Sequence, residues 1–365
     1  MRQQILIFIS LALTIYFGLH TLLFFLLVKF FSLKDRLARF GLAALLLFLA
    51  LSFIAAFIWS RSGGQPFLRW FYYGSALWLG ILVNLLLILG TGLLVYTLLK
   101  SIALKPDLKF LGVCLLGLTV LYTFYGLHQA TRIKTTFLSI PIKNRPPEWQ
   151  GKKIAQVSDI HLGLINGEDL ARKITNQFNG QKVDLVFLTG DILDGSGDNL
   201  ARLIEPFDRI KAPVFYITGN HETYVGLDKV VKAIERTKIR LLRDEIIDLG
   251  GVQVIGIDYP PRGQRKNLKP ILEKIDKTKP GILLWHEPSN IELARRYPIA
   301  LQLSGHTHNG QMWPMKLFTY LIYKGYDHGL HRMGDYSLYT TSGVGTWGPP
   351  MRIGSRPEIV IITVQ

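Results

Sequence analysis

The first 131 residues alternate long apolar segments with short basic connections. Four segments lack Asp, Glu, Lys and Arg altogether: Ile5–Val28, Gly41–Trp59, Phe71–Leu99 and Leu111–Tyr125. The first of them has 24 residues, which as a helix would measure about 36 Å and so cross a hydrocarbon core of about 30 Å. It is also too long for the apolar region of a signal peptide, and no small-residue cleavage motif follows it. The pattern therefore predicts a membrane domain of four transmembrane helices over residues 1–131.

A different pattern begins after residue 131, where short β-rich runs alternate with amphipathic segments. Residues 132–151 contain three prolines and one alternating stretch, 137–142, and predict a linker with an edge strand. Five brief apolar runs then predict strands: Lys153–Ser158, Val183–Thr189, Val214–Thr218, Ile282–Trp285 and Ala300–Ser304. Apolar residues at helical spacing predict helices over 168–178, 199–210 and 227–237. We expect residues 152–365 to form an α/β domain, a sandwich of two sheets with helices outside.

Each predicted strand ends at residues that can bind a metal ion. These segments are Asp159-Ile160-His161, Gly190-Asp191, Gly219-Asn220-His221-Glu222, Trp285-His286 and Gly305-His306-Thr307-His308. Asp159 and His161 are separated by a single residue and so point to the same side of an extended segment, where they can hold one ion. Imidazole, carboxylate and amide ligands without thiolates suit manganese, iron or zinc. A second ion roughly 3.5 to 4 Å away would need a shared ligand, and Asp191 suits that position. One such segment alone is more typical of a turn, but five in succession predict a metal site.

In this order the segments resemble the motifs of the calcineurin-like metallophosphoesterase superfamily, which read D-x-H, G-D, G-N-H-[ED], H and G-H-x-H. The resemblance extends over Lys134–Gln365, and SDIHLG, SGHTHNGQ and GVGTWGPPMRIGSRPE are similar to its bacterial membrane-associated branch. It implies an αββα sandwich in which a water or hydroxide between two divalent ions (Mn²⁺, Fe²⁺ or Zn²⁺) attacks phosphorus. One position departs from the pattern: Asn309 stands where a glycine is usual, which affects the adjacent loop or pocket wall and removes no ligand.

The resemblance also implies a role for each motif residue. One ion would be held by Asp159, His161 and His308 and the other by Asn220, His286 and His306, with Asp191 joining the two. His221 would be the catalytic acid that protonates the leaving oxygen, because an imidazole can donate a proton near neutral pH. Glu222 would either orient His221 or be solvated.

Aromatic side chains are frequent from Trp313 onward, and His328 and His331 lie among them. One interpretation is a purely structural lid. The alternative is a substrate-binding role for both histidines and for Arg352, whose guanidinium can meet phosphate oxygens. A basic, aromatic lid beside a membrane suits a substrate with a phosphate head group and an apolar tail.

Positive charge is concentrated in the membrane domain. The chain carries a formal charge of +16, of which residues 1–140 contribute +10 through twelve Lys or Arg against Asp35 and Asp107. This distribution fits anionic lipid head groups and argues against nucleic acid as a partner. The single cysteine, Cys114, excludes an intrachain disulfide.

Charge in the short connections between spans also bears on orientation. Connections on one side of the membrane carry seven Lys or Arg, and those on the other side carry three, or seven if the stretch after the last span is included. The first count predicts that the domain after the spans lies outside the cytoplasm.

Together these features predict a multi-pass protein of the cell membrane that hydrolyses phosphomonoester, phosphodiester or pyrophosphate bonds with two metal ions, in small-molecule or lipid-linked substrates. Two alternatives are a non-catalytic binding or regulatory domain on a membrane anchor and a membrane transporter with an accessory domain. The complete set of ligands argues against the first. The second is disfavoured because no Asp, Glu, Lys or Arg interrupts a span. The substrate, the metal and the oligomeric state are left open.

Overall fold

The computed structural model describes residues 2–60, 66–104, 106–195 and 199–365, which divide into two compact units. One unit comprises Met1–His128 with Gly348–Met351, and the other comprises Gln129–Trp347 with Arg352–Gln365.

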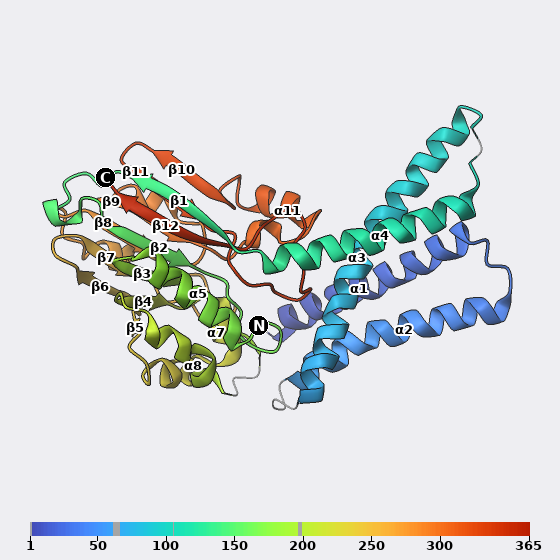
Figure 1. The fold of residues 1–365 in the computed structure, drawn as a ribbon, viewed down its shortest axis with the longest axis horizontal. Coiled ribbons are helices and arrows are strands. Elements are labelled where there is room, and N and C mark those ends of the chain that lie inside the picture. The colour runs from blue at the N-terminus through green and yellow to red at the C-terminus, as the bar shows by residue number, and fades with distance from the viewer. Residues whose placement is uncertain (1, 61–65, 105, 196–198) are drawn as a thin grey trace. The chain divides into compact units, whose positions relative to one another are not determined.

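Four long apolar helices form the first unit (Figure 1). They are α1 (Arg2–Phe30), α2 (Arg36–Trp59), α3 (Pro66–Ser101) and α4 (Leu108–Thr131). Each contains a stretch long and apolar enough to cross a membrane, namely Ile9–Phe30, Arg36–Trp59, Phe67–Ser101 and Leu108–Thr131. The four predicted apolar helices are therefore confirmed, with bounds a few residues wider than the uncharged segments.

Leucine packing and a few polar contacts hold this bundle together. Leu23, Leu46 and Leu85 belong to its buried core. The indole Nε1 of Trp78 donates to His20 Nε2 at 3.1 Å, and Asn84 Nδ2 donates to Thr123 Oγ1 at 3.1 Å. These bonds satisfy polar groups that would be costly to leave unpaired in an apolar surrounding.

The second unit is a sandwich of two six-stranded sheets with the strand orders β1-β12-β2-β3-β4-β5 and β10-β11-β9-β8-β7-β6. The first sheet contains β1 (Lys134–Ile140), β2 (Lys153–Val157), β3 (Leu185–Thr189), β4 (Val214–Ile217), β5 (Arg240–Leu241) and β12 (Glu358–Val364). The second contains β6 (Glu245–Asp248), β7 (Gln253–Gly256), β8 (Gly281–Leu284), β9 (Ile299–Ser304), β10 (Gly329–Met333) and β11 (Tyr336–Thr340). The predicted edge strand is β1, which begins earlier than expected and pairs in parallel with the C-terminal strand β12.

Helices cover the outer face of each sheet, which confirms the αββα arrangement. On the first sheet lie α5 (Glu168–Gln181), α6 (Leu200–Ile204), η3 (Glu205–Arg209), α7 (Asn220–Val225) and α8 (Leu227–Ile234). On the second lie α9 (Lys269–Leu272) and α10 (Ile291–Ala294). The helix predicted over 199–210 changes from α6 to the 3₁₀ helix η3 because Pro206 has no N–H to continue the α-helical bonding. The core between the sheets includes Phe187 and Leu301.

The strand directions explain why the polar motifs meet. Strands β2, β3 and β4 are mutually parallel in the first sheet, and β8 and β9 are parallel in the second. The carboxyl ends of parallel strands lie at the same edge of a sheet, which is where loops build sites in such folds. The five motif-bearing strands thus belong to two sheets, three of them to the first and two to the second.

Candidate metal centre

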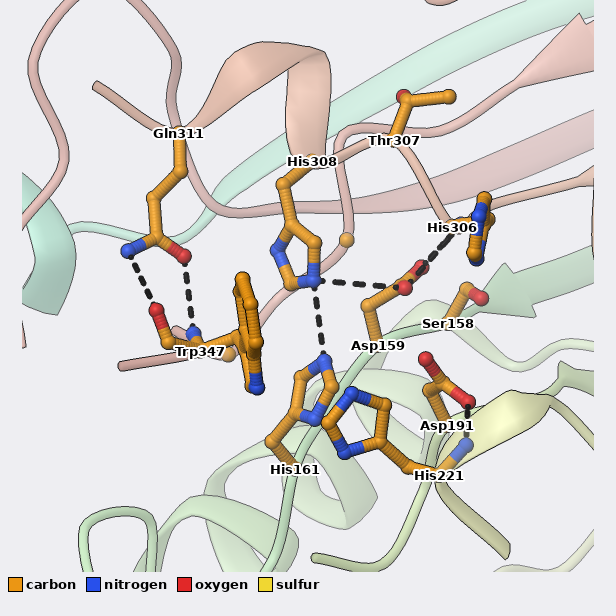
Figure 2. A network of polar contacts seen from close by, with 12 residues as sticks. Ser158, Asp159, His161, Asp191, His221, His306, Thr307, His308, Gln311 and Trp347 are labelled. Carbon is orange, nitrogen blue, oxygen red and sulfur yellow. Dashed lines mark hydrogen bonds and ion pairs between the residues drawn. The ribbon is translucent and has the colours of Figure 1, made fainter. Parts of the chain in front are cut away.

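Three predicted ligands meet at the end of β2 (Figure 2). The ligand atoms of Asp159, His161 and His308 lie within 4.8 Å of one another. His161 Nε2 is 3.0 Å from His308 Nε2, which is 3.5 Å from Asp159 Oδ1. Two imidazole nitrogens bound to one metal at 2.0–2.1 Å are separated by roughly 3.0–3.4 Å. The observed spacing therefore fits two ligands on a shared cation.

A second group of predicted ligands lies at the ends of β3, β8 and β9. Asp191, His286 and His306 also place their ligand atoms within 4.8 Å of one another. His286 Nδ1 is 2.7 Å from the Thr189 carbonyl, which can only accept, so Nδ1 carries the proton and Nε2 presents its lone pair. That lone pair faces Asp191 Oδ2 at 3.2 Å, an arrangement that needs a proton or a cation between the two atoms. Burial lowers the pKa of His286, but the Asp191 carboxylate outweighs it and raises the pKa to about 10.

Asn220 supplies the most direct test of whether these residues fit a metal. Its Oδ1 is buried and has no hydrogen-bond partner among the described residues. A buried acceptor without a partner costs about 1–3 kcal/mol, and a cation would remove that cost. Carboxylate, amide and imidazole donors without thiolate form the mixed set that suits borderline divalent ions. The residues present therefore fit a metal pair.

The backbone of the ligand loops is unusual as well. Five predicted ligands have a positive φ in the left-handed region: Asp159 (53°), His161 (51°), Asp191 (53°), His306 (73°) and His308 (51°). Non-glycine residues seldom adopt this conformation, and residues held in it cost of order 1–3 kcal/mol each. Such strain concentrates at functional sites, where the surrounding structure holds it in place.

Two motif glycines allow the loops to approach one another. A Cβ on Gly219 would lie 2.2 Å from Asp191 Oδ1, and one on Gly305 would lie 2.1 Å from Ser158 Oγ. Neither position has room for a side chain, so glycine there is a requirement of close packing around the carboxylates. Asn309, the departure from the family pattern, has φ 49° and ψ 41° and is buried. Asparagine tolerates this left-handed conformation better than most residues, so it preserves the loop that a glycine would otherwise form.

His221 stands beside both groups and has a carboxylate partner that the sequence analysis missed. Its Nδ1 lies 3.1 Å from Asp194 Oδ1, and its backbone N–H donates to Asp191 Oδ1 at 2.8 Å. Burial lowers the pKa of His221, but the Asp191 and Asp194 carboxylates raise it to about 9. Asp194 follows Asp191 by three residues, so the extended motif Gly-Asp-x-x-Asp was the signal that could have identified it.

Glu222 takes neither of the two positions expected for it. It is fully buried, and its carboxylate accepts from the backbone N–H groups of Asp191 (3.0 Å), Ile192 (2.8 Å), Leu193 (3.0 Å) and Gly219 (2.7 Å). The expectation of a solvated residue or of a partner for His221 is therefore wrong. Glu222 instead ties the loop that carries Asp191 to the loop that carries Asn220.

The three residues predicted to bind substrate lie in different surroundings. Arg352 is fully buried and donates to the carbonyls of Gly343 and Gly345, with Nη2 at 3.3 Å from His308 Nδ1. His328 Nε2 lies 3.3 Å from Glu358 Oε1, and His331 Nε2 lies 3.1 Å from the His328 carbonyl. Arg352 thus borders the first ligand group, while the two histidines contact Glu358 and each other. Their role in substrate binding stays a prediction.

Aromatic rings surround the ligands. The Trp347 ring lies 6.0 Å from that of His221, and Trp347 is held by a reciprocal pair of hydrogen bonds with the Gln311 amide (Figure 2). Tyr259 and Tyr323 lie 6.4 Å and 6.1 Å from the His306 ring. The centre is therefore lined by planar apolar surfaces on the sides of both ligand groups.

Comparison with known proteins agrees with this chemistry. Residues 152–310 match the family model of the calcineurin-like phosphoesterases. An uncharacterised metallophosphoesterase of Aquifex aeolicus is 33% identical over 230 residues, which cover 60% of this chain and 87% of that protein. One from Helicobacter pylori is 34% identical over 219 residues, covering 58% of this chain and 59% of the relative.

A relative with membrane segments extends the similarity. A transmembrane protein with metallophosphoesterase domain from Danio rerio is 30% identical over 271 residues, covering 68% of this chain and 61% of that protein. The chain thus spans about three fifths of the length of several curated relatives.

Proposed function

The chain belongs to the calcineurin-like metallophosphoesterase family, and on that premise we propose that it is a phosphohydrolase that requires two divalent cations. It is a membrane-anchored metallophosphoesterase with clusters of His and Asp that can hold metal ions.

The observation that carries the proposal is the pair of ligand groups, of which the second contains Asp191, whose backbone carbonyl accepts from the N–H of His161 in the first. Asp159, His161 and His308 would hold one ion, and Asn220, His286 and His306 the other, with Asp191 shared. Two such cations lower the pKa of a bound water and offset negative charge on phosphoryl oxygens. The spacing of His161 Nε2 and His308 Nε2 and the orphaned Asn220 Oδ1 support this assignment.

His221 is the residue that would move a proton. With Nδ1–H donating to Asp194, a protonated His221 has its Nε2–H available for the leaving oxygen of the substrate. The Asp191 and Asp194 carboxylates favour this charged form, since they raise the pKa of His221 against the effect of burial. Asp194 would therefore orient the imidazole and keep it protonated.

Substrate and orientation complete the proposal. The aromatic rings of Trp347 and Tyr323 beside the ligands suit a phosphoester or pyrophosphate that carries an apolar group, including one borne by a lipid. The excess of Lys and Arg in the connections on one side of the spans supports an extracytoplasmic catalytic domain.

The test uses the full chain in detergent or nanodiscs with added Mn²⁺. Aryl phosphate monoesters, aryl phosphate diesters and pyrophosphate are offered to the wild type and to His221→Ala. We expect metal-dependent hydrolysis of at least one class, with turnover lowered about 10²–10⁴-fold in the variant while metal stays bound. Absence of hydrolysis of all three classes, or equal turnover in the two proteins, would overturn the assignment.

A further inference from the structure

We propose that helix α11 (Met315–Ile322) is an interfacial membrane helix, seated with its apolar face in an anionic bilayer surface. This helix, labelled in Figure 1, follows the loop of His306 and His308 in the chain. None of its residues is buried. Its large apolar side chains are strongly exposed: Leu317 48%, Phe318 53%, Leu321 63% and Ile322 69%.

The orientation of α11 is the reverse of that of an ordinary surface helix. At about 100° per residue, its apolar residues Leu317, Leu321, Phe318, Ile322 and Met315 occupy an arc of about 160°. A surface helix of a globular protein turns such an arc toward the core. In α11 the residue that faces the domain is instead the polar Thr319, whose Oγ1 donates to Asp327 Oδ2 at 3.0 Å. The apolar arc is therefore the outer face.

The contacts beneath α11 hold it against the ligand loop. Asp327 is buried, and its carbonyl accepts from Thr307 Oγ1 at 2.6 Å, between the ligands His306 and His308. Gly310 approaches the backbone of Lys316 so closely that a Cβ would lie 2.2 Å from the Lys316 nitrogen. These polar and backbone contacts position the helix without using its apolar side chains, which remain available to another medium.

Composition identifies that medium as lipid rather than protein. Residues 313–326 include Lys316 and Lys324 and no acidic residue, while Trp313 and Tyr320 are also exposed at 43% and 56%. Apolar residues flanked by aromatic and basic ones are typical of helices that lie in the head-group region of anionic membranes. Only two residues separate α4, a candidate membrane span, from strand β1 of the catalytic unit, so the chain itself keeps this unit near a bilayer.

The consequence for the reaction rests on the function proposed above. A helix in the head-group region that is attached to the loop of two ligands would hold the metal centre at the depth of lipid phosphates. The substrate class it suits is a phosphoester or pyrophosphate carried by a membrane lipid.

Depth measurement tests the proposal without relying on activity. In full chain carrying Cys114→Ala, Leu321→Cys is labelled with an environment-sensitive fluorophore and reconstituted into phosphatidylglycerol-containing vesicles. Phe318→Cys provides a second position on the same face, and exposed Lys277→Cys is the matched control. We expect blue-shifted emission and quenching by lipids with shallow spin labels at 321 and 318, and water-like emission at 277. Water-like emission at 321 and 318 would overturn the proposal and show that the helix faces solvent. A blue shift that lipid labels do not quench and that grows with protein density would also overturn it, because the helix would then face a second copy of the chain.

A kinetic arm separates this inference from the proposed function. Leu321→Glu with Ile322→Glu is expected to lower turnover of a phosphorylated lipid in vesicles at least about tenfold while leaving that of a soluble aryl phosphate unchanged. Equal turnover of the lipid by variant and wild type would contradict the inferred consequence. Lack of any hydrolysis by the wild type would instead refute the proposed function and leave the depth measurement standing.

Discussion

Replacement of Asp194 by asparagine tests the proton-donating arrangement most selectively. In the wild type, His221 Nδ1 lies 3.1 Å from Asp194 Oδ1. The asparagine amide keeps the shape of the carboxylate and an oxygen that can accept from Nδ1, but it removes the negative charge. A hydrogen bond between charged partners contributes about 1.5–3 kcal/mol. This bond stabilises the protonated form of His221, which is the form that donates, so its loss lowers the population of that form. At a pH above the His221 pKa of about 9, kcat therefore falls about 10- to 150-fold, because each 1.36 kcal/mol is a factor of ten.

The assay compares two leaving groups on the same phosphate. Phenyl phosphate needs a proton on its departing oxygen, whereas 4-nitrophenyl phosphate releases a much weaker base and needs the acid less. We therefore expect Asp194→Asn to slow the first substrate by the full factor and the second only slightly. Bound metal, measured by mass spectrometry, should stay at the wild-type level. Asp169→Asn, which changes a fully exposed carboxylate, is the matched control and should leave both rates unaltered.

One outcome would refute the reasoning about Asp194. Its Oδ2 lies 3.8 Å from His161 Nδ1, and Asp194, His161 and His221 together could also hold an ion. Equal slowing of both substrates accompanied by loss of metal would mean that Asp194 is a ligand, and its assigned role in orienting His221 would be wrong.

Three further predictions follow from other parts of the chain. A Cβ at position 219 would lie only 2.2 Å from Asp191 Oδ1, so Gly219→Ala should displace that carboxylate and abolish metal binding. Gly180→Ala, where no atom lies within 4 Å of the new Cβ, should bind metal normally, and normal metal content in Gly219→Ala would contradict the packing argument. Burial raises the pKa of Glu358, but its bonds to His328 and Ser342 outweigh burial and lower that pKa to about 2. The Glu358 charge therefore stabilises the fold above the ordinary pKa of 4.5, and this stabilisation is lost as the pH falls toward 2. Glu358→Gln should lower the free energy of unfolding by about 3 kcal/mol at pH 7 and by progressively less below pH 4.5. The difference in thermal midpoint between variant and wild type should therefore shrink on acidification, and a difference independent of pH would exclude the charge as its cause. Alkaline phosphatase fused after Gln365 should be active and green fluorescent protein there dark in a bacterial host, and the opposite pattern would place the domain in the cytoplasm.

The parts of the structure that sequence could predict are those determined by local chemistry. A span is recognisable because length and lack of charge suffice, and α1 to α4 follow the four uncharged segments. The ligand motifs are recognisable because each is a contiguous group at the end of a strand, as at Asp159 and His161 after β2. Parallel strand ends share an edge of one sheet, so the meeting of the motifs after β2, β3 and β4 could be expected before any coordinates, whereas their meeting with the motifs after β8 and β9 depends on how the two sheets pack.

What sequence could not predict depends on pairing across the fold. Glu222 follows His221 directly, yet its carboxylate turns back to four backbone N–H groups, while Asp194, 27 residues earlier, contacts the imidazole. Periodicity likewise predicts that α11 has an apolar arc but not which way the arc faces. The bond from Thr319 to Asp327 shows that it faces outward.

Metal removal and replacement tests the central claim most directly. The purified full chain is stripped with a chelator, metal content is counted, and hydrolysis of an aryl phosphate is followed as Mn²⁺ is restored, alongside Asp191→Asn. We predict that the wild type binds two ions per chain and regains activity with the second, and that Asp191→Asn neither retains the pair nor hydrolyses the substrate. Undiminished hydrolysis by the stripped protein, or by Asp191→Asn, would contradict a mechanism built on two cations sharing this carboxylate.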